Sequence, residues 1–195
     1  MRSRQAQLYW LLGDRDSSAA AIADAERYAE RVTWPDALAE LALSKAELAR
    51  WAGHAEEAYQ QLGVATTVLG DEAERADIRA VTHDLLGYLA GDLSEARAHR
   101  AAACQAATDA GHAPLIAKVL VGVADLALRR DQYVQAARLL AASAGVLGLP
   151  DRSHPDLTRI EQIARHRLGD ARLAEAAREG TQTSWSQLVA VTLAT

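Results

Sequence analysis

The sequence has few of the residues on which disulfide-bonded and membrane proteins rely. Phenylalanine and asparagine are absent, the one methionine is the first residue, and Cys104 is the one cysteine. A lone cysteine cannot form an internal disulfide, which fits a reducing compartment such as the cytoplasm. No apolar run reaches the roughly 20 residues needed to cross a bilayer, and the polar start MRSRQAQLYW is unlike a secretory signal. We therefore expect a soluble cytoplasmic protein with no membrane contact.

Motifs typical of catalysis and cofactor binding are also missing. The lysines are Lys45 and Lys118, and neither follows a glycine, so the sequence has no phosphate-binding loop with its Gly-Lys pair. No two histidines have the spacing of four residues, with a glutamate, that marks a metalloprotease helix. No serine stands in a Gly-x-Ser-x-Gly turn, and Cys104 lies among alanines, where a small core residue fits. We therefore expect no enzymatic activity, no metal and no cofactor.

The charge balance is acidic. The net charge is −5 at pH 7, whereas nucleic-acid-binding domains usually carry a basic surplus. Residues 151–180 contain six arginines, but six acidic residues accompany them, as on a solvated face of mixed charge. We therefore expect no direct contact with nucleic acid.

Alanine is what the sequence has in abundance. Alanine accounts for 44 of the 195 residues, and large apolar side chains are sparse. Because alanine is the best helix former and lets helices approach closely, this composition favours long helices over a bulky globular core. No segment shows strand-like alternation of useful length. The sequence therefore predicts an all-α protein.

A turn residue followed by an alanine recurs along the chain. A glycine or aspartate stands five residues before an alanine in four places, which are Gly53 and Ala58, Gly91 and Ala96, Asp131 and Ala136, and Gly169 and Ala174. Successive turn residues are 38, 40 and 38 positions apart, and Gly13 lies 40 positions before Gly53. A period in this range is typical of stacked helical repeats.

The chemistry of the two positions explains why they recur together. A glycine after a helix can adopt the left-handed conformation that ends the helix, and aspartate does so less well. The alanine in the next helix keeps the two helices close. Each unit is therefore expected to be a pair of antiparallel helices, and one pair cannot bury its apolar faces alone.

The expected helices follow from this pattern. The first ends near residue 12, the second is capped by Ser17 or Ser18 and extends to about residue 32, and the others cover about 36–52, 55–69, 74–90, 93–110, 114–130, 132–147, 155–168 and 171–179. Residues 148–155 are expected to form a loop. Ser184 and Gln187 have capping-box spacing before a last helix at 188–194, which would close the final repeat. The fold prediction is a single domain, residues 1–195, forming an α-solenoid of four to five helix pairs with a C-terminal capping helix.

Helix pairs with a Gly-x-x-x-x-Ala corner resemble tetratricopeptide (TPR) repeats, although the period here is near 39 residues. At the C-terminal end, Leu168-Gly169-Asp170, then Glu179-Gly180 and Ser184 before a short apolar helix, resemble the tail of actinobacterial transcription regulators. These are the ATP-binding LuxR-type and the SARP-type regulators, and the resemblance covers roughly residues 36–195. It implies a TPR-like sensory or protein-interaction module of a transcription regulator.

The resemblance also implies a partner. The partner would be a protein or peptide, or another domain of a longer regulator, since the chain is either a fragment of such a regulator or a freestanding protein. A homodimer is an alternative, because the exposed end faces of a solenoid can pair.

In TPR arrays the first helix of each pair lines a concave groove. Counting back from each turn residue gives the expected groove positions, which are Glu40, Glu47, Arg50, Trp51, Val81, Leu85, Tyr88, Lys118, Asp125, Arg129, Arg159 and His166. Interleaved aromatic and charged side chains suit a peptide or a small ligand. The alternative for Trp51 and Tyr88 is that they pack between neighbouring helix pairs.

A rival hypothesis is a helical enzyme or small-ligand-binding protein whose polar groups meet in the groove, for instance around His166, Asp125 and Glu47. A buried polar cluster with shifted pKa values would favour the rival, whereas separate solvated charges would favour a protein-interaction module.

Overall fold

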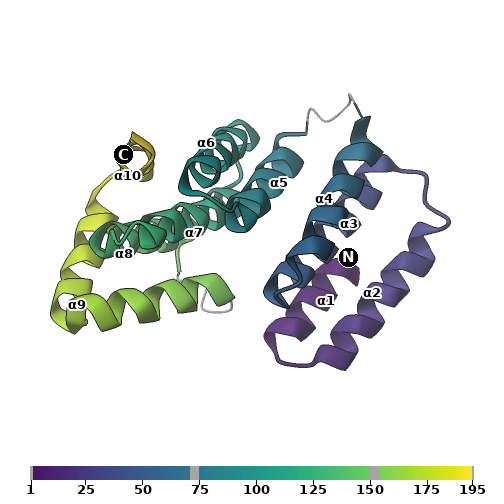
Figure 1. Ribbon diagram of the computed structural model, residues 1–195, viewed down its shortest axis with the longest axis horizontal. Coiled ribbons are helices and arrows are strands. Elements are labelled where there is room, and N and C mark those ends of the chain that lie inside the picture. Colours follow the sequence, from purple (N-terminus) through teal and green to yellow (C-terminus); the bar gives the residue numbers. More distant parts are fainter. Residues whose placement is uncertain (1, 71–74, 150–153, 195) are drawn as a thin grey trace.

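A computed structural model describes residues 2–70, 75–149 and 154–194 of the chain. Within these ranges the regular structure is entirely helical (Figure 1). The helices are α1 (Arg2–Leu11), α2 (Arg15–Ala29), α3 (Pro35–Trp51), α4 (Ala55–Leu69), α5 (Ala76–Leu89), α6 (Leu93–Ala110), α7 (Ala113–Arg129), α8 (Tyr133–Leu147), α9 (Pro155–Gln182) and α10 (Trp185–Ala194). No described helix has the length and hydropathy needed to cross a membrane. The all-α prediction is confirmed.

The helix bounds follow the sequence pattern closely. The helices expected at 55–69 and 93–110 occupy those residues as α4 and α6, and most others differ by one to three residues at their ends. The expected start at residue 74 and the middle of the loop expected at 148–155 lie outside the described residues.

The helices associate mainly as consecutive pairs. α1 packs along α2, α3 along α4, α5 along α6 and α7 along α8, while α9 packs along α8 (Figure 1). The first helices of successive pairs also touch, since α1 contacts α3, α3 contacts α5, α5 contacts α7, and α7 contacts α9. These first helices therefore form a continuous inner row. In Figure 1 the start of α9 points from below α7 toward α1 and α3.

The corner pattern holds fully in two of its four copies and in part in the other two. Gly53, Asp131 and Gly169 have positive φ, and Ala58, Ala96 and Ala136 are fully buried. Two positions differ from the expectation. Gly91 does not have positive φ, because α5 ends through an extended Ala90 with ψ 129°. Ala174 is exposed, so the last corner lacks the close helix contact of the others.

The cap of the second helix also differs from the expectation. The second helix is capped by Asp14, whose Oδ1 accepts from the Ser17 N–H at 3.0 Å, and not by Ser17 or Ser18. Ser18 is buried and donates to the Ala6 carbonyl of α1 at 2.8 Å instead. Asp14 caps α2 because it directly precedes the helix, whereas Ser17 and Ser18 lie inside it.

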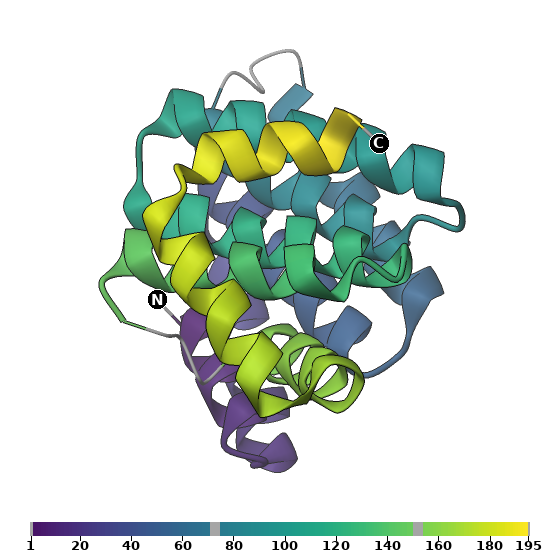
Figure 2. The same cartoon turned by 90° about the vertical axis from the view of Figure 1, so that its left-hand side faces the viewer.

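The C-terminal end has two features. Gly169, at φ 75° and ψ 162°, interrupts α9, so the two helices expected at 155–168 and 171–179 are its two halves. The Ser184 Oγ accepts from the Gln187 N–H at 3.3 Å, and α10 starts at Trp185. Figure 2 faces this end of the molecule and shows α10 lying across the helices behind it, and α10 contacts α6, α7 and α8.

The apolar core is divided along the chain. The largest cluster of buried residues joins α6, α7, α8, the first half of α9 and α10, and a second cluster joins α3, α4 and α5. Cys104 belongs to the first cluster, and burial raises the pKa of its thiol to about 12. The thiol therefore stays protonated near neutral pH and packs as a small core side chain.

A fully buried ion pair joins α5 to α6 beside α7. The Arg100 Nη1 donates to the Asp84 carboxylate and, at 2.8 Å, to the Asp84 carbonyl. Both side chains are 0% exposed, and burial raises the pKa of Asp84 although Arg100 opposes that shift. The pair fits because two neighbouring helix positions are glycines. A Cβ on Gly122 would lie 2.7 Å from the Arg100 Cζ, and a Cβ on Gly87 would lie 2.8 Å from its Nε.

Replacing Gly122 with alanine should destabilise the protein, because the added Cβ would occupy the space of this ion pair. We expect the free energy of unfolding to fall by about 2–4 kcal/mol, which corresponds to a melting temperature lower by roughly 10 °C. The matched control is Gly145→Ala in α8, where an added Cβ meets no atom within 4 Å. There alanine should leave stability unchanged or raise it by up to about 1 kcal/mol. Equal melting temperatures for the two variants, measured by circular dichroism, would contradict this packing.

Candidate functional site

The inner row of helices encloses adjoining hollows between α1, α3, α5, α7 and the start of α9. Two of them, of about 400 and 690 Å³, share Arg4, Gln7, Glu47, Pro114 and Lys118 in their walls, and we call them together the Lys118 groove. The third, of about 840 Å³, is lined by Arg15, Arg50, Tyr88, Asp125, Arg129, Asp156 and Arg159 among others, and we call it the Arg129 pocket. Trp51 and Pro155 line both the Lys118 groove and the Arg129 pocket.

Glu47 is the centre of the Lys118 groove. Its Oε1 accepts from the Lys118 Nζ of α7 at 2.6 Å, and its Oε2 accepts from the Gln7 Nε2 of α1 at 2.9 Å. Burial by itself raises the pKa of Glu47, but Lys118, with Arg50 and His154, outweighs burial and holds the net pKa below its ordinary value. Glu47 therefore remains ionised and connects three helices through charge-assisted hydrogen bonds.

Asp156, in the first turn of α9, is the central carboxylate of the Arg129 pocket, as Glu47 is of the Lys118 groove. It accepts from Arg50 of α3 through two nitrogens, at 2.7 and 3.3 Å, and from the Arg159 Nη2 at 3.3 Å. The Arg159 Nη2 also donates to the Asp125 Oδ1 at 2.6 Å. Burial by itself raises the pKa of Asp156, but the hydrogen bond and charge of Arg50, together with His154 and Arg159, outweigh burial and hold the net pKa below its ordinary value.

Tyr88 lies between two cations. The Cζ atoms of Arg50 and Arg100 are 4.1 and 3.9 Å from its ring centroid, within the range of cation–π attraction. Burial raises the pKa of the Tyr88 hydroxyl well above its ordinary value. The hydroxyl is buried and has no hydrogen-bond partner among the described residues.

Other buried polar atoms around the two hollows also lack partners in the described parts of the chain. They are the Trp51 Nε1, the Arg50 Nε and both ring nitrogens of His154. Burial lowers the pKa of His154, so its imidazole is neutral near pH 7. Because buried polar groups are nearly always hydrogen-bonded in native proteins, a group of unsatisfied atoms calls for partners from outside the chain, such as water or a bound ligand.

Two arginines of the Arg129 pocket form no ion pair with a described carboxylate. The Arg129 Nη1 and Nη2 donate to the carbonyls of Gly87 and Ala90 at 3.4 and 3.0 Å, at the end of α5. The Arg15 Nη1 donates to the Trp10 carbonyl at 2.6 Å, and its guanidinium lies 3.3 Å from the centroid of the Trp10 ring. With four arginines and two aspartates in its wall, the pocket has a formal charge of +2.

Most of the groove positions expected from the sequence come together here. Glu40, Glu47, Val81 and Lys118 line the Lys118 groove, Arg50, Tyr88, Asp125, Arg129 and Arg159 line the Arg129 pocket, and Trp51 lines both. Trp51 is only partly buried, and part of it packs against an apolar cluster of α1, α2 and α3. Trp51 therefore packs between helices, as one alternative from the sequence expected, and also lines the hollows.

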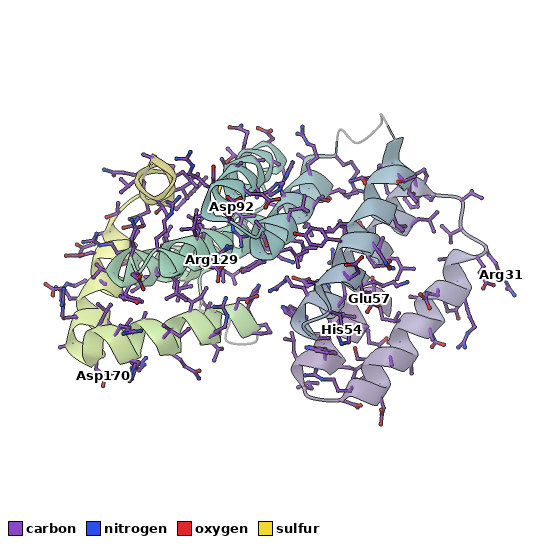
Figure 3. The ribbon with its side chains drawn as sticks, in the orientation of Figure 1. Arg31, His54, Glu57, Asp92, Arg129 and Asp170 are labelled. Carbon is purple, nitrogen blue, oxygen red and sulfur yellow. The ribbon has the colours of Figure 1, made fainter. Side chains whose placement is uncertain are left out.

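Two expected positions lie elsewhere. Leu85 is fully buried in the cluster of α3, α4 and α5. His166 is exposed and lines none of these hollows. The reason is that α9 reaches the site with its first turn, so ten residues of helix, about 15 Å, separate His166 from Asp156. Figure 3 shows Arg129 in the middle of the molecule and Asp170 at the far end of this half of α9.

Several site residues were not identified from the sequence. Asp156 follows a proline in a first helical turn, where an acidic residue is ordinary, and Arg100 lies in an alanine-rich helix that predicts a solvated arginine. The one available signal was the glycines inside α5 and α7. Gly87 and Gly122 interrupt good helix-forming sequence, and a glycine there usually marks a close approach of another group.

Comparisons with known proteins identify no relative of this chain. No protein-family model matches it, and neither a curated protein nor a solved structure matches it significantly. Its function is therefore inferred from the geometry of the site together with the sequence features.

Replacing Glu47 with glutamine should lower the free energy of unfolding at pH 7, and it should lower it by less at acidic pH. The folded pKa of Glu47 lies below its ordinary value of 4.5, so the ionised carboxylate contributes stability above about pH 4.5 that is lost as the pH falls through the folded pKa. We expect Glu47→Gln to lower the free energy of unfolding in urea by about 2–3 kcal/mol at pH 7. The difference from the wild type should shrink below about pH 4.5.

The control is Glu57→Gln on α4, whose side chain is 54% exposed and is labelled in Figure 3. It should stay within about 0.5 kcal/mol of the wild type throughout. A difference for Glu47→Gln that is constant from pH 7 to pH 3 would mean that the ionised carboxylate does not provide the stability.

Proposed function

We propose that this chain is a non-catalytic, effector-binding module with a TPR-like solenoid architecture. The single observation that carries the proposal is the buried polar cluster of the inner helix row, where several polar atoms lack partners beside hollows of about 400–840 Å³. This is the size range of small-molecule sites. The rival hypothesis from the sequence, a helical enzyme or small-ligand-binding protein, named a buried polar cluster with shifted pKa values as its mark, and the cluster supports that class over a protein-interaction surface.

The order of helix contacts supports the solenoid architecture. The first helices of successive pairs are in contact along the whole row, as expected of stacked TPR-like units, and the second helices α6 and α8 also pack on α7 and α9. Four pairs and the two halves of α9 would form the array. α10, which covers α7 and α8, would be the capping helix.

The electrostatics of the site support recognition more than acid–base catalysis. A general acid or base works best with a pKa near the working pH. The pKa values of Glu47 and Asp156 are instead lowered, away from neutrality, by basic partners. His154 is held neutral by burial. These groups would present fixed charges and dipoles to a ligand, with little exchange of protons near pH 7.

A role in transcription regulation is the second part of the proposal. It rests on the sequence resemblance of residues 36–195 to the C-terminal arrays of LuxR-type and SARP-type regulators. In such a role the effector would stabilise one arrangement of the inner helices. A protein partner, either another domain or a separate chain, would then respond to that arrangement.

An enzyme is the second candidate, and one observation favours it. His154 shares the Lys118 groove with Glu47, Lys118 and Ser143, and neither of its ring nitrogens has a described hydrogen-bond partner, although Nδ1 lies 3.9 Å from the Asp156 Oδ2. A neutral imidazole of this kind could accept a proton from a substrate.

The test is a thermal-shift screen of the wild-type chain against bacterial metabolites below about 600 Da. A ligand present at 100 times its dissociation constant should stabilise the protein by about 2.7 kcal/mol, which raises the melting temperature by roughly 5–10 °C. Trp51→Phe removes an Nε1 that has no described partner and part of a ring that packs against α1, α2 and α3, so the free protein should stay folded with a melting temperature lower by a few degrees. We expect this variant to bind a ligand that accepts from Nε1 about tenfold more weakly.

The matched control is Trp34→Phe, because Trp34 is 68% exposed and lies outside the three hollows. A screen in which no compound shifts the wild type would refute small-ligand binding. Equal affinity in Trp51→Phe and Trp34→Phe would place the ligand elsewhere, and recovery of a chemically altered ligand would favour the enzyme.

A further inference from the structure

We infer that the Arg129 pocket binds the oxyanion group, a carboxylate or a phosphate, of a small organic ligand. The inference rests on the proposed function and specifies the chemical class of its ligand. The protein has a net charge of −5, yet this pocket has four arginines against two aspartates. A local positive charge in an acidic protein attracts anions of matching size.

The pairing inside the pocket shows which arginines are available. Asp156 is paired with Arg50, and Asp125 is paired with Arg159. Both aspartates are at least 90% buried, so their charges are compensated inside the wall. The two positive charges that remain belong to Arg15 and Arg129, which have no described ion-pair partner.

Arg129 is held in place by hydrogen bonds but keeps unused N–H donors. A guanidinium has five N–H donors, and the hydrogen bonds to Gly87 and Ala90 account for two of the five in Arg129. Those bonds fix the side chain at the end of α5, so little further ordering is needed when a ligand binds. The planar group still has donors for an oxyanion, which it can bind in bidentate fashion.

Arg15 faces the same pocket from α2. Its single described hydrogen bond, to the Trp10 carbonyl, and its position over the Trp10 ring orient the guanidinium. Arg15 is exposed, which fits a group at the entrance of the pocket. Deeper in the pocket, the Trp51 Nε1 and the Arg50 Nε are buried donors without described partners. Both unsatisfied nitrogens of this wall are donors, so they add to the positive potential of the pocket and to its preference for an anion.

The test measures binding of inorganic phosphate, a sugar phosphate, citrate and benzoate by isothermal titration calorimetry, at constant ionic strength. We expect at least one of these oxyanions to bind the wild type with a dissociation constant below 1 mM, and sodium chloride to weaken binding. Arg129→Gln should weaken it at least tenfold, and Arg129→Lys less. Binding of the phosphates without citrate or benzoate would identify a phosphate ligand, and the opposite result would identify a carboxylate ligand.

Arg97→Gln is the matched control, because Arg97 is exposed on α6 and lines none of the three hollows. It should bind as the wild type does. If Arg129→Gln loses its helical circular dichroism, Arg15→Gln replaces it, since Arg15 is exposed and its loss should leave folding intact. Unchanged binding in Arg129→Gln or, in its place, Arg15→Gln would overturn the inference.

The outcomes also separate this inference from the proposed function. If the metabolite screen finds only neutral or cationic ligands and no oxyanion binds, effector binding stands and the anion site is wrong. If no compound of any charge binds, both are wrong.

Discussion

The arrangement of the inner helices depends on matching buried carboxylates with cations from other helices. Among the described residues the buried acidic side chains are four, and they pair as Glu47 with Lys118, Asp84 with Arg100, Asp125 with Arg159 and Asp156 with Arg50. In the fully buried pair of Asp84 and Arg100, removing one partner would leave a buried charge uncompensated, at a cost of about 3–5 kcal/mol. Three of these pairs connect helices that are not neighbours in sequence, namely α3 with α7, α7 with α9 and α3 with α9. They therefore fix the positions of these helices more strictly than alanine contacts could.

This way of holding the helices together also determines what the site can do. Apolar contacts between helices tolerate sliding, whereas a bidentate guanidinium–carboxylate pair has one geometry. The inner face therefore holds its remaining donors, on Trp51, His154 and Arg129, at fixed positions before any ligand arrives. A preorganised set of donors loses less conformational entropy on binding, and this favours a small ligand over a long flexible peptide.

Local structure was accessible from the sequence because its causes are local. Helix starts and stops depend on residues such as Gly53, Pro114 and Ser184, whose effects extend over a few positions, and the helix bounds follow them. Counting back along each helix also found most of the site, since helical periodicity places those residues on one face. The partners could not be found this way. That Asp156 meets Arg50, 106 residues away, depends on how α9 approaches α3, and no local pattern encodes that approach.

The two glycines beside Arg100 have a consequence for how this sequence can change over time. Four positions on three helices, Asp84, Gly87, Arg100 and Gly122, share one small space. A side chain at position 122 is tolerable only if position 100 has already become smaller, and a smaller residue there leaves Asp84 without its counter-charge. We expect these four residues to be inherited or replaced as a set, so that related chains fall into two groups, with few intermediates between them.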